Sequence, residues 1–239
     1  MGLAGLSVAM LGASANAEIE SEFTVGYHTD YIFRGFDIGE DMMDFALDFA
    51  GTGYCDFDWA AGVWFATFDP SDPDSDYEDE LNIYGGISRD FNFVTLEGGF
   101  IRYVFIDDGG AGNTELYLSA STEWNNFGFG ATWYYNVDAE RESSTESGDW
   151  YAEIFANYAL CFTETLTGEI GVMCAFYDYD NDSGDEDGFA HWGAYASLTA
   201  QISDNITLSP YIQYVDNESD YNGDDDDILW GGIRATFAF

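Results

Sequence analysis

The stretch FGFGATWYYNV, residues 127–137, indicates the fold of this chain because bulky and small or polar side chains alternate along it. Phe127, Phe129, Trp133 and Val137 share one face, and glycine, threonine, tyrosine and asparagine occupy the other. A period of two predicts a β-strand with one apolar and one polar face. A stretch of this length is also sufficient for a tilted strand to cross a lipid bilayer.

The same alternation recurs along the chain on both sides of this stretch. Such segments lie near residues 20–30, 42–50, 57–68, 81–88, 93–105, 114–124, 127–137, 150–162, 165–177, 189–202, 206–215 and 228–239. Their even number is typical of single-chain bacterial barrels. The sequence therefore predicts one all-β domain, an antiparallel up-and-down transmembrane β-barrel of about twelve strands.

The connections between these segments alternate between short and long. The short set comprises residues 51–56, 89–92, 125–126, 163–165 and 203–205, and the long set comprises 30–41, 69–80, 106–113, 138–149, 178–188 and 216–227. Most of the acidic residues fall in the long set. This asymmetry predicts short periplasmic turns and longer, acidic outer loops, because outer-membrane barrels are built in that way.

The composition excludes some partners and favours others. The chain has 46 acidic residues against five arginines and no lysine, which gives a formal net charge of −41. A phosphate backbone would be repelled, so nucleic acid is excluded as a partner. Outer-membrane lipid and small ions or solutes are the partners that a barrel of this kind predicts.

The two ends of the chain indicate its compartment. Residues 1–17 are mostly small or apolar and end in Ala15-Asn16-Ala17, the pattern that signal peptidase recognises. We therefore expect a signal peptide over 1–17 and a β-barrel over 18–239 in the outer membrane of a Gram-negative cell. The last strand ends on Phe239, and a terminal aromatic strand resembles the recognition signal of the barrel-insertion machinery.

Charged side chains within the strands are predicted to line the interior. The expected pore-lining residues are Asp44, Asp48, Asp58, Glu97, Arg102, Glu115, Glu123, Glu153, Glu169 and Arg234. Arg102 lies five positions after Glu97, an odd step, so a regular strand would turn one of the two toward lipid. We expect a β-bulge at Gly98-Gly99 to bring both inside, because glycine pairs are common at bulges.

A short motif near the start of the chain resembles a known family. In TVGYHTDYIFRG, residues 24–35, Tyr31, Phe33, Arg34 and Gly35 match the opening of the TorF family of porin-type outer-membrane proteins. The specific part of the resemblance covers about a dozen residues, and it implies a barrel and a pore but no catalytic residues. Physically, Gly35 permits a positive φ, and we expect Arg34 to fold back and clamp carboxylates at the mouth of the barrel; the alternative is an ordinary exposed loop arginine.

These observations predict a porin for the passive diffusion of small solutes or ions, with a preference for cations because carboxylates surround the lumen. The alternative is a non-conducting structural or adhesive barrel with cation-binding surface loops. Catalysis is not expected, since His28 and His191 lack a partner set for an active site. No cofactor is expected either, although alternating acids could bind calcium instead of forming solvated loops. The candidate ligands for that metal are Asp72, Asp74, Asp76, Asp178, Asp180 and Asp182.

Overall fold

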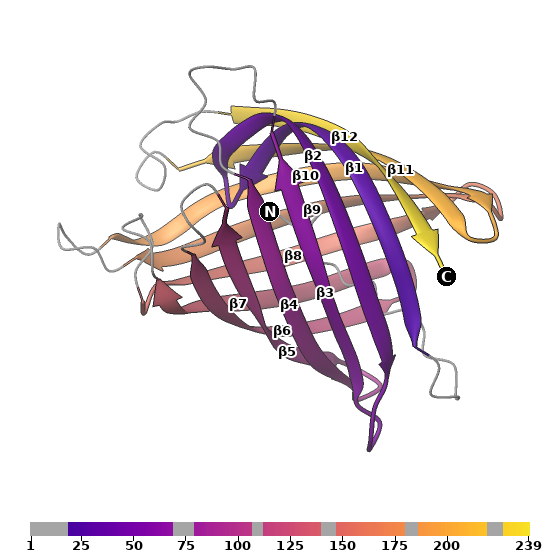
Figure 1. Cartoon of the computed structure of the whole chain (residues 1–239), viewed down its shortest axis with the longest axis horizontal. Helices are drawn as coiled ribbons and strands as arrows, with labels where there is room; N and C mark the ends of the chain where they lie inside the picture. Colours follow the sequence, from indigo (N-terminus) through magenta and orange to yellow (C-terminus); the bar gives the residue numbers. More distant parts are fainter. Residues whose placement is uncertain (1–18, 69–78, 107–111, 140–146, 180–185, 219–226) are drawn as a thin grey trace.

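The computed structural model describes residues 19–68, 79–106, 112–139, 147–179, 186–218 and 227–239. Each of the predicted strands is present (Figure 1). They are β1 Glu20–Phe33, β2 Phe36–Thr52, β3 Asp58–Thr67, β4 Glu80–Asp90, β5 Thr95–Phe105, β6 Asn113–Trp124, β7 Phe127–Ala139, β8 Trp150–Cys161, β9 Leu166–Tyr179, β10 Glu186–Ser203, β11 Ile206–Asn217 and β12 Asp227–Ala238. The predicted signal peptide over 1–17 lies outside the described residues.

The strands form one closed barrel in which every strand pairs antiparallel with its neighbours in the sequence. The ring closes where β1 pairs with β12, for example through Val25 and Ala235. Closure leaves no strand edge unpaired, which removes the exposed edge that an open sheet would present. No helix of the described part of the chain has the length and apolar content to cross a membrane.

The two ends of the barrel differ. At the short-turn end, the strands are joined by residues 53–57, 91–94, 125–126, 162–165 and 204–205. The opposite end, the long-loop end, carries the longer connections and includes the turn between β1 and β2. The predicted alternation of connection lengths is therefore confirmed, with the exception of the connection after β1 that is described below.

Alternation along each strand separates an apolar outer surface from a more polar interior. On β12, Leu229, Ile233 and Phe237 are exposed on the outside, whereas Trp230 is buried inside. The same division holds on β6, where Leu116 and Leu118 are exposed and Glu115, which directly precedes Leu116, is buried. A continuous apolar exterior around a closed barrel is the surface that a lipid bilayer covers.

The predicted bulge at Gly98-Gly99 is absent, and the prediction that Arg102 lines the interior is wrong. Strand β5 pairs with β4 in unbroken register from Thr95 to Phe105. Glu97 therefore faces inward, and Arg102 faces outward beside the exposed Ile83. The outward charge is tolerated because Arg102 lies near the long-loop end, where its guanidinium donates to the Thr114 hydroxyl at 3.0 Å and lies 3.8 Å from the Asp138 carboxylate.

Aromatic rings on the inner wall lie flat over glycines of the adjacent strand. The ring of Tyr195 on β10 covers Gly171 on β9, and its hydroxyl donates to Glu169. Tyr84 on β4 covers Gly62 on β3 in the same way and donates to Asp48. Glycine is needed at these positions because any side chain would occupy the space of the ring. The rings thus line the wall instead of projecting into the lumen.

We expect Gly171→Ala to destabilise the barrel by about 1–3 kcal/mol, the usual cost of overpacking. The added Cβ would overlap Cε1 of Tyr195, so the ring must leave the wall and lose its hydrogen bond to Glu169. Equilibrium unfolding in denaturant measures the change. Gly98→Ala is the matched control, because its Cβ would meet only ordinary contacts beyond 3.5 Å. Equal stability of the two variants would contradict the role of the Gly171 contact.

Candidate functional site

The long-loop end is crossed by a hairpin formed by the ends of β1 and β2. The sequence predicted a long loop over 30–41, and this prediction is wrong, because β1 continues to Phe33 and β2 starts at Phe36. Arg34 and Gly35 form the turn, with φ of 52° and 90°. Two successive residues with positive φ are typical of the tight type I′ hairpin turn. We call residues 31–36 the hairpin tip.

The hairpin tip leaves the barrel wall and is enclosed on both of its faces. A register shift between Tyr31 and Ile32 places an extra residue on β2, and bulges of this kind bend a strand. Tyr31 and Ile32 are adjacent yet only 3% and 4% exposed. In a strand with one outer face, one of the two would be exposed. The tip is therefore folded into the lumen, as the curvature of β1 and β2 in Figure 1 shows.

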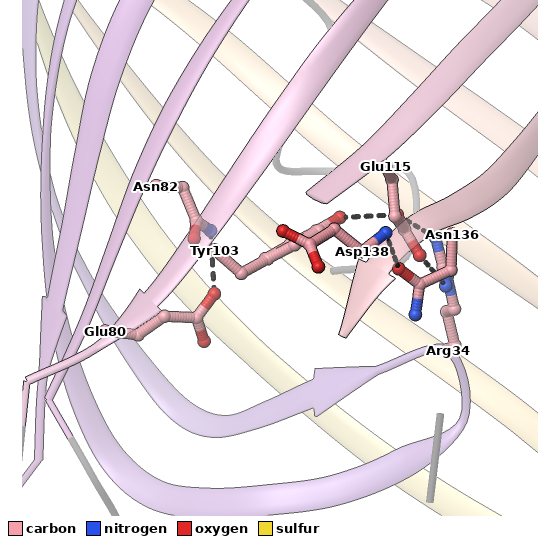
Figure 2. Close-up of polar contacts among 7 residues, drawn as sticks. All are labelled: Arg34, Glu80, Asn82, Tyr103, Glu115, Asn136 and Asp138. Atoms are coloured by element: carbon pink, nitrogen blue, oxygen red, sulfur yellow. Dashed lines mark hydrogen bonds and ion pairs between the residues drawn. The ribbon is translucent and has the colours of Figure 1, made fainter. Parts of the chain in front are cut away.

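Arg34 reaches the wall opposite its own strand. Its guanidinium donates two parallel hydrogen bonds to Glu115 on β6, at 2.8 and 2.7 Å (Figure 2). The rings of Tyr134 on β7 and Tyr151 on β8 lie 4.9 and 4.5 Å from the guanidinium carbon. In the ring of strands, β7 is as far from β1 as a strand can be. The hairpin tip therefore crosses the lumen, and the predicted ion pair of Arg34 with a carboxylate is present.

We call Glu115, Tyr103, Tyr134 and Tyr151 the wall cage, since these four residues of β5 to β8 surround the guanidinium. The Tyr103 hydroxyl donates to the second Glu115 oxygen at 3.0 Å. The ion pair is buried, with the Arg34 residue only 5% exposed. A guanidinium that is paired bidentately and covered by aromatic faces is held more firmly than an exposed ion pair. The wall cage thus holds the hairpin tip in the lumen, and we call the Arg34–Glu115 ion pair the latch.

Further contacts attach the hairpin tip to other strands. The Tyr31 hydroxyl donates to Glu80 on β4 at 3.1 Å, and Asn82 donates to the other oxygen of Glu80 at 2.7 Å. On the far side, the Asn217 amide on β11 donates to the Gly35 carbonyl at 2.9 Å. Figure 2 shows the Glu80–Asn82 pair on one side of the interior and Arg34 with Glu115 on the other. The tip is consequently anchored to several sectors of the wall.

A second buried network lies where the barrel closes on itself. Nε2 of His28 on β1 is 3.0 Å from Asp44 on β2, and its Nδ1 shares a hydrogen bond with the Tyr211 hydroxyl on β11. Asp44 also accepts a hydrogen bond of 2.9 Å from the Trp64 indole and lies 3.9 Å from Nε of Arg234. We call this set the closure network. It connects β1, β2 and β3 with β11 and β12.

Apart from Arg102, the predicted pore-lining residues face the interior. Asp44 and Arg234 belong to the closure network, and Glu115 belongs to the wall cage. Glu153 is buried beside that cage. The wall residues Asp48, Glu97 and Glu169 each accept a hydrogen bond from a tyrosine hydroxyl, and Asp58 and Glu123 lie nearer the short-turn end. The interior therefore carries carboxylates at both ends and along the wall.

The predicted metal site is not supported by the described residues, and one buried carboxylate, Glu80, was not predicted. The candidate metal ligands Asp72, Asp74, Asp76, Asp180 and Asp182 lie outside the described residues, and Asp178 accepts a hydrogen bond of 2.8 Å from the Trp150 indole. Within the described ranges, no group of three or more metal-binding side chains is present. Sequence reasoning also missed Glu80, which was assigned to an acidic loop. Glu80 directly precedes the alternating segment 81–88, and this position could have indicated that it belongs to the strand.

Comparison with known proteins shows a porin-type barrel fold. An outer-membrane channel from Pseudomonas putida F1 matches with a TM-score of 0.60 and 10% identity over 95% of this chain and 98% of that chain. The NanC porin matches with a TM-score of 0.56 and 13% identity over 91% and 98%, respectively. The KdgM porin matches with a TM-score of 0.53 and 10% identity over 92% and 99%. At such low identity, the likeness shows a shared fold.

No protein-family model matches the sequence, and no curated protein matches it. The resemblance to the TorF family therefore remains limited to the motif around Tyr31, Phe33, Arg34 and Gly35. In this structure, the motif forms the hairpin tip together with its latch.

Proposed function

We propose that this chain is an outer-membrane channel that passes small cations and is closed at the long-loop end by the hairpin tip. The main support for the proposal is the set of carboxylates that face the lumen from β2, β3, β4, β5, β6, β8 and β9. Among the described inner-face residues, the arginines are Arg34 and Arg234, and both are paired with carboxylates. Fixed negative charge raises the local concentration of cations and repels anions.

The apolar exterior and the similarity to outer-membrane porins support a location in the outer membrane. The interior argues against an acidic solute. KdgM is a porin whose structure has been determined with disordered oligogalacturonate, a polyanion. A lumen lined by Asp48, Glu97 and Glu169 would repel such a chain, so we assign a different class of solute to this barrel. Phe239, which directly follows β12, is exposed, and we propose that this strand contacts the barrel-insertion machinery.

Planar-bilayer recordings on the refolded protein test the proposal. A salt gradient should give reversal potentials for cation preference, measured near 0.1 M salt or below, where the screening length is about 10 Å. The triple variant Asp48→Asn, Glu97→Gln and Glu169→Gln should lower the cation-to-anion permeability ratio severalfold toward unity. Asp204→Asn in an exposed turn is the control and should retain the ratio. Anion preference of the unaltered protein would refute the proposed selectivity.

A non-conducting structural barrel is the second candidate, because the hairpin tip and the side chains packed on it fill the long-loop end. Tyr31, Trp64, Phe68 and Tyr103 belong to one buried cluster there. The two candidates differ in one observable property. If neither the natural protein nor a variant without the Arg34 latch shows channel events, the structural role is favoured.

A further inference from the structure

We infer that the wall cage is a binding site for organic cations that carry a guanidinium group, and that Arg34 occupies this site as an internal ligand when the hairpin tip is closed. The inference rests on the proposed function in one respect: a solute reaches the cage only through an accessible lumen. It adds a solute class to the general preference for cations.

The wall cage belongs to the barrel and not to the hairpin. Glu115, Tyr103, Tyr134 and Tyr151 lie on four consecutive strands, β5 to β8, which are joined by antiparallel pairing with one register shift, next to Glu115 between β6 and β7. Arg34 is the part that comes from the hairpin turn. If the tip leaves the lumen, the carboxylate fork and the two aromatic faces remain in place. The closed structure therefore shows a receptor with its ligand bound.

The geometry of the cage selects a guanidinium over other cations. Two hydrogen bonds of 2.8 and 2.7 Å run side by side from the Arg34 nitrogens to the two Glu115 oxygens. Only a planar, forked donor makes such a pair, whereas an ammonium is a point charge on a flexible stem. The ring faces at 4.5 and 4.9 Å suit a flat cation. Glu153 adds a second carboxylate that interacts electrostatically with Arg34.

A buried amide beside the cage independently points to a ligand. Asn136 is the register partner of Glu115 and is 2% exposed. Its Oδ1 accepts a hydrogen bond from the Asp138 backbone, but its Nδ2 has no acceptor among the described residues. Figure 2 shows Asn136 next to Glu115 and the Arg34 guanidinium. An unpaired buried donor is costly, and a carbonyl or carboxylate oxygen on the incoming cation would satisfy it.

Calorimetry with the full chain refolded in detergent micelles tests the inference. The probe is arginine amide, with lysine amide as the ammonium analogue and citrulline amide as the neutral, equally planar analogue. Arg34→Gln vacates the cage, so this variant should bind arginine amide at least about tenfold more tightly than the natural protein. It should also prefer arginine amide to either analogue by about tenfold or more. Adding Glu115→Gln should abolish the binding, and adding Glu218→Gln, an exposed acid at the same end, should not.

Equal binding of the three amides to Arg34→Gln, or no binding, would overturn the inference. The unaltered protein gives a second measurement that does not require this variant to fold. Arginine amide should displace Arg34 and accelerate chymotrypsin cleavage next to Phe33 and Phe36, whereas lysine amide should not. Equal cleavage rates would again reject the site. Both assays are independent of conduction, so a barrel that binds arginine amide without conducting would refute the proposed function alone.

Discussion

Replacing Arg34 with glutamine should turn a mostly closed channel into a mostly open one. The change removes the cation from a buried ion pair and leaves Glu115 enclosed without its partner. Breaking a buried pair in this way costs about 3–5 kcal/mol, and the cost falls on the closed state alone. A loss of about 3 kcal/mol lowers the ratio of closed to open channels roughly 100-fold. Single-channel recording measures the change as open probability.

Two control variants separate the latch from a general loss of charge. Exchanging the partners, Arg34→Glu with Glu115→Arg, restores opposite charges across the lumen and should recover part of the closure. Arg89→Gln removes an arginine whose carboxylate contact, with Asp56 at 3.9 Å, is exposed, so the open probability should not change. If Arg34→Gln and Arg89→Gln had the same open probability, the hairpin tip would not be a gate.

Removal of the Asp44 carboxylate should have the largest effect on stability. Asp44→Ala leaves the imidazole of His28 and the indole of Trp64 buried without their acceptor and takes away the countercharge of Arg234. Loss of one member of such a buried network costs about 3–5 kcal/mol. The free energy of unfolding in denaturant measures this loss.

Asp48→Ala is the matched control for Asp44→Ala. It alters the same face of β2 four residues further along the strand, where the carboxylate accepts a hydrogen bond from the Tyr84 hydroxyl. The expected loss is about 1–2 kcal/mol, because a single hydrogen bond to a charged group is removed. Comparable losses for the two variants would show that the closure network adds no stability of its own.

The number and order of the strands could be predicted because lipid and lumen impose opposite demands on alternate residues. Phe127 to Val137 shows the rule in its simplest form, because Phe127, Phe129, Trp133 and Val137 are all exposed on the outside. Arg102 shows where prediction from alternation fails. The rule assigns a face, but it does not show how far along the barrel a residue lies, and near the long-loop end a charge can remain on the outside beside Asp138.

The hairpin tip could not be predicted from alternation because both of its faces are covered. Tyr31, Ile32 and Phe33 form an unbroken apolar run, which resembles neither a membrane strand nor a polar loop. The wall cage was only partly foreseen for a different reason. Glu115 was assigned to the interior and Arg34 to a clamp, but their pairing joins residues 81 positions apart and depends on the register of every strand between them.

The contacts of the hairpin tip also imply an order of assembly. The tip is synthesised well before β11, yet Gly35 binds Asn217, a residue 182 positions later. Contacts so distant along the chain form late in folding, since the intervening loop must close before they contribute any stability. The barrel must therefore close by pairing β12 with β1 before the hairpin tip can bind inside the lumen. A newly inserted barrel is consequently permeable until this last folding step.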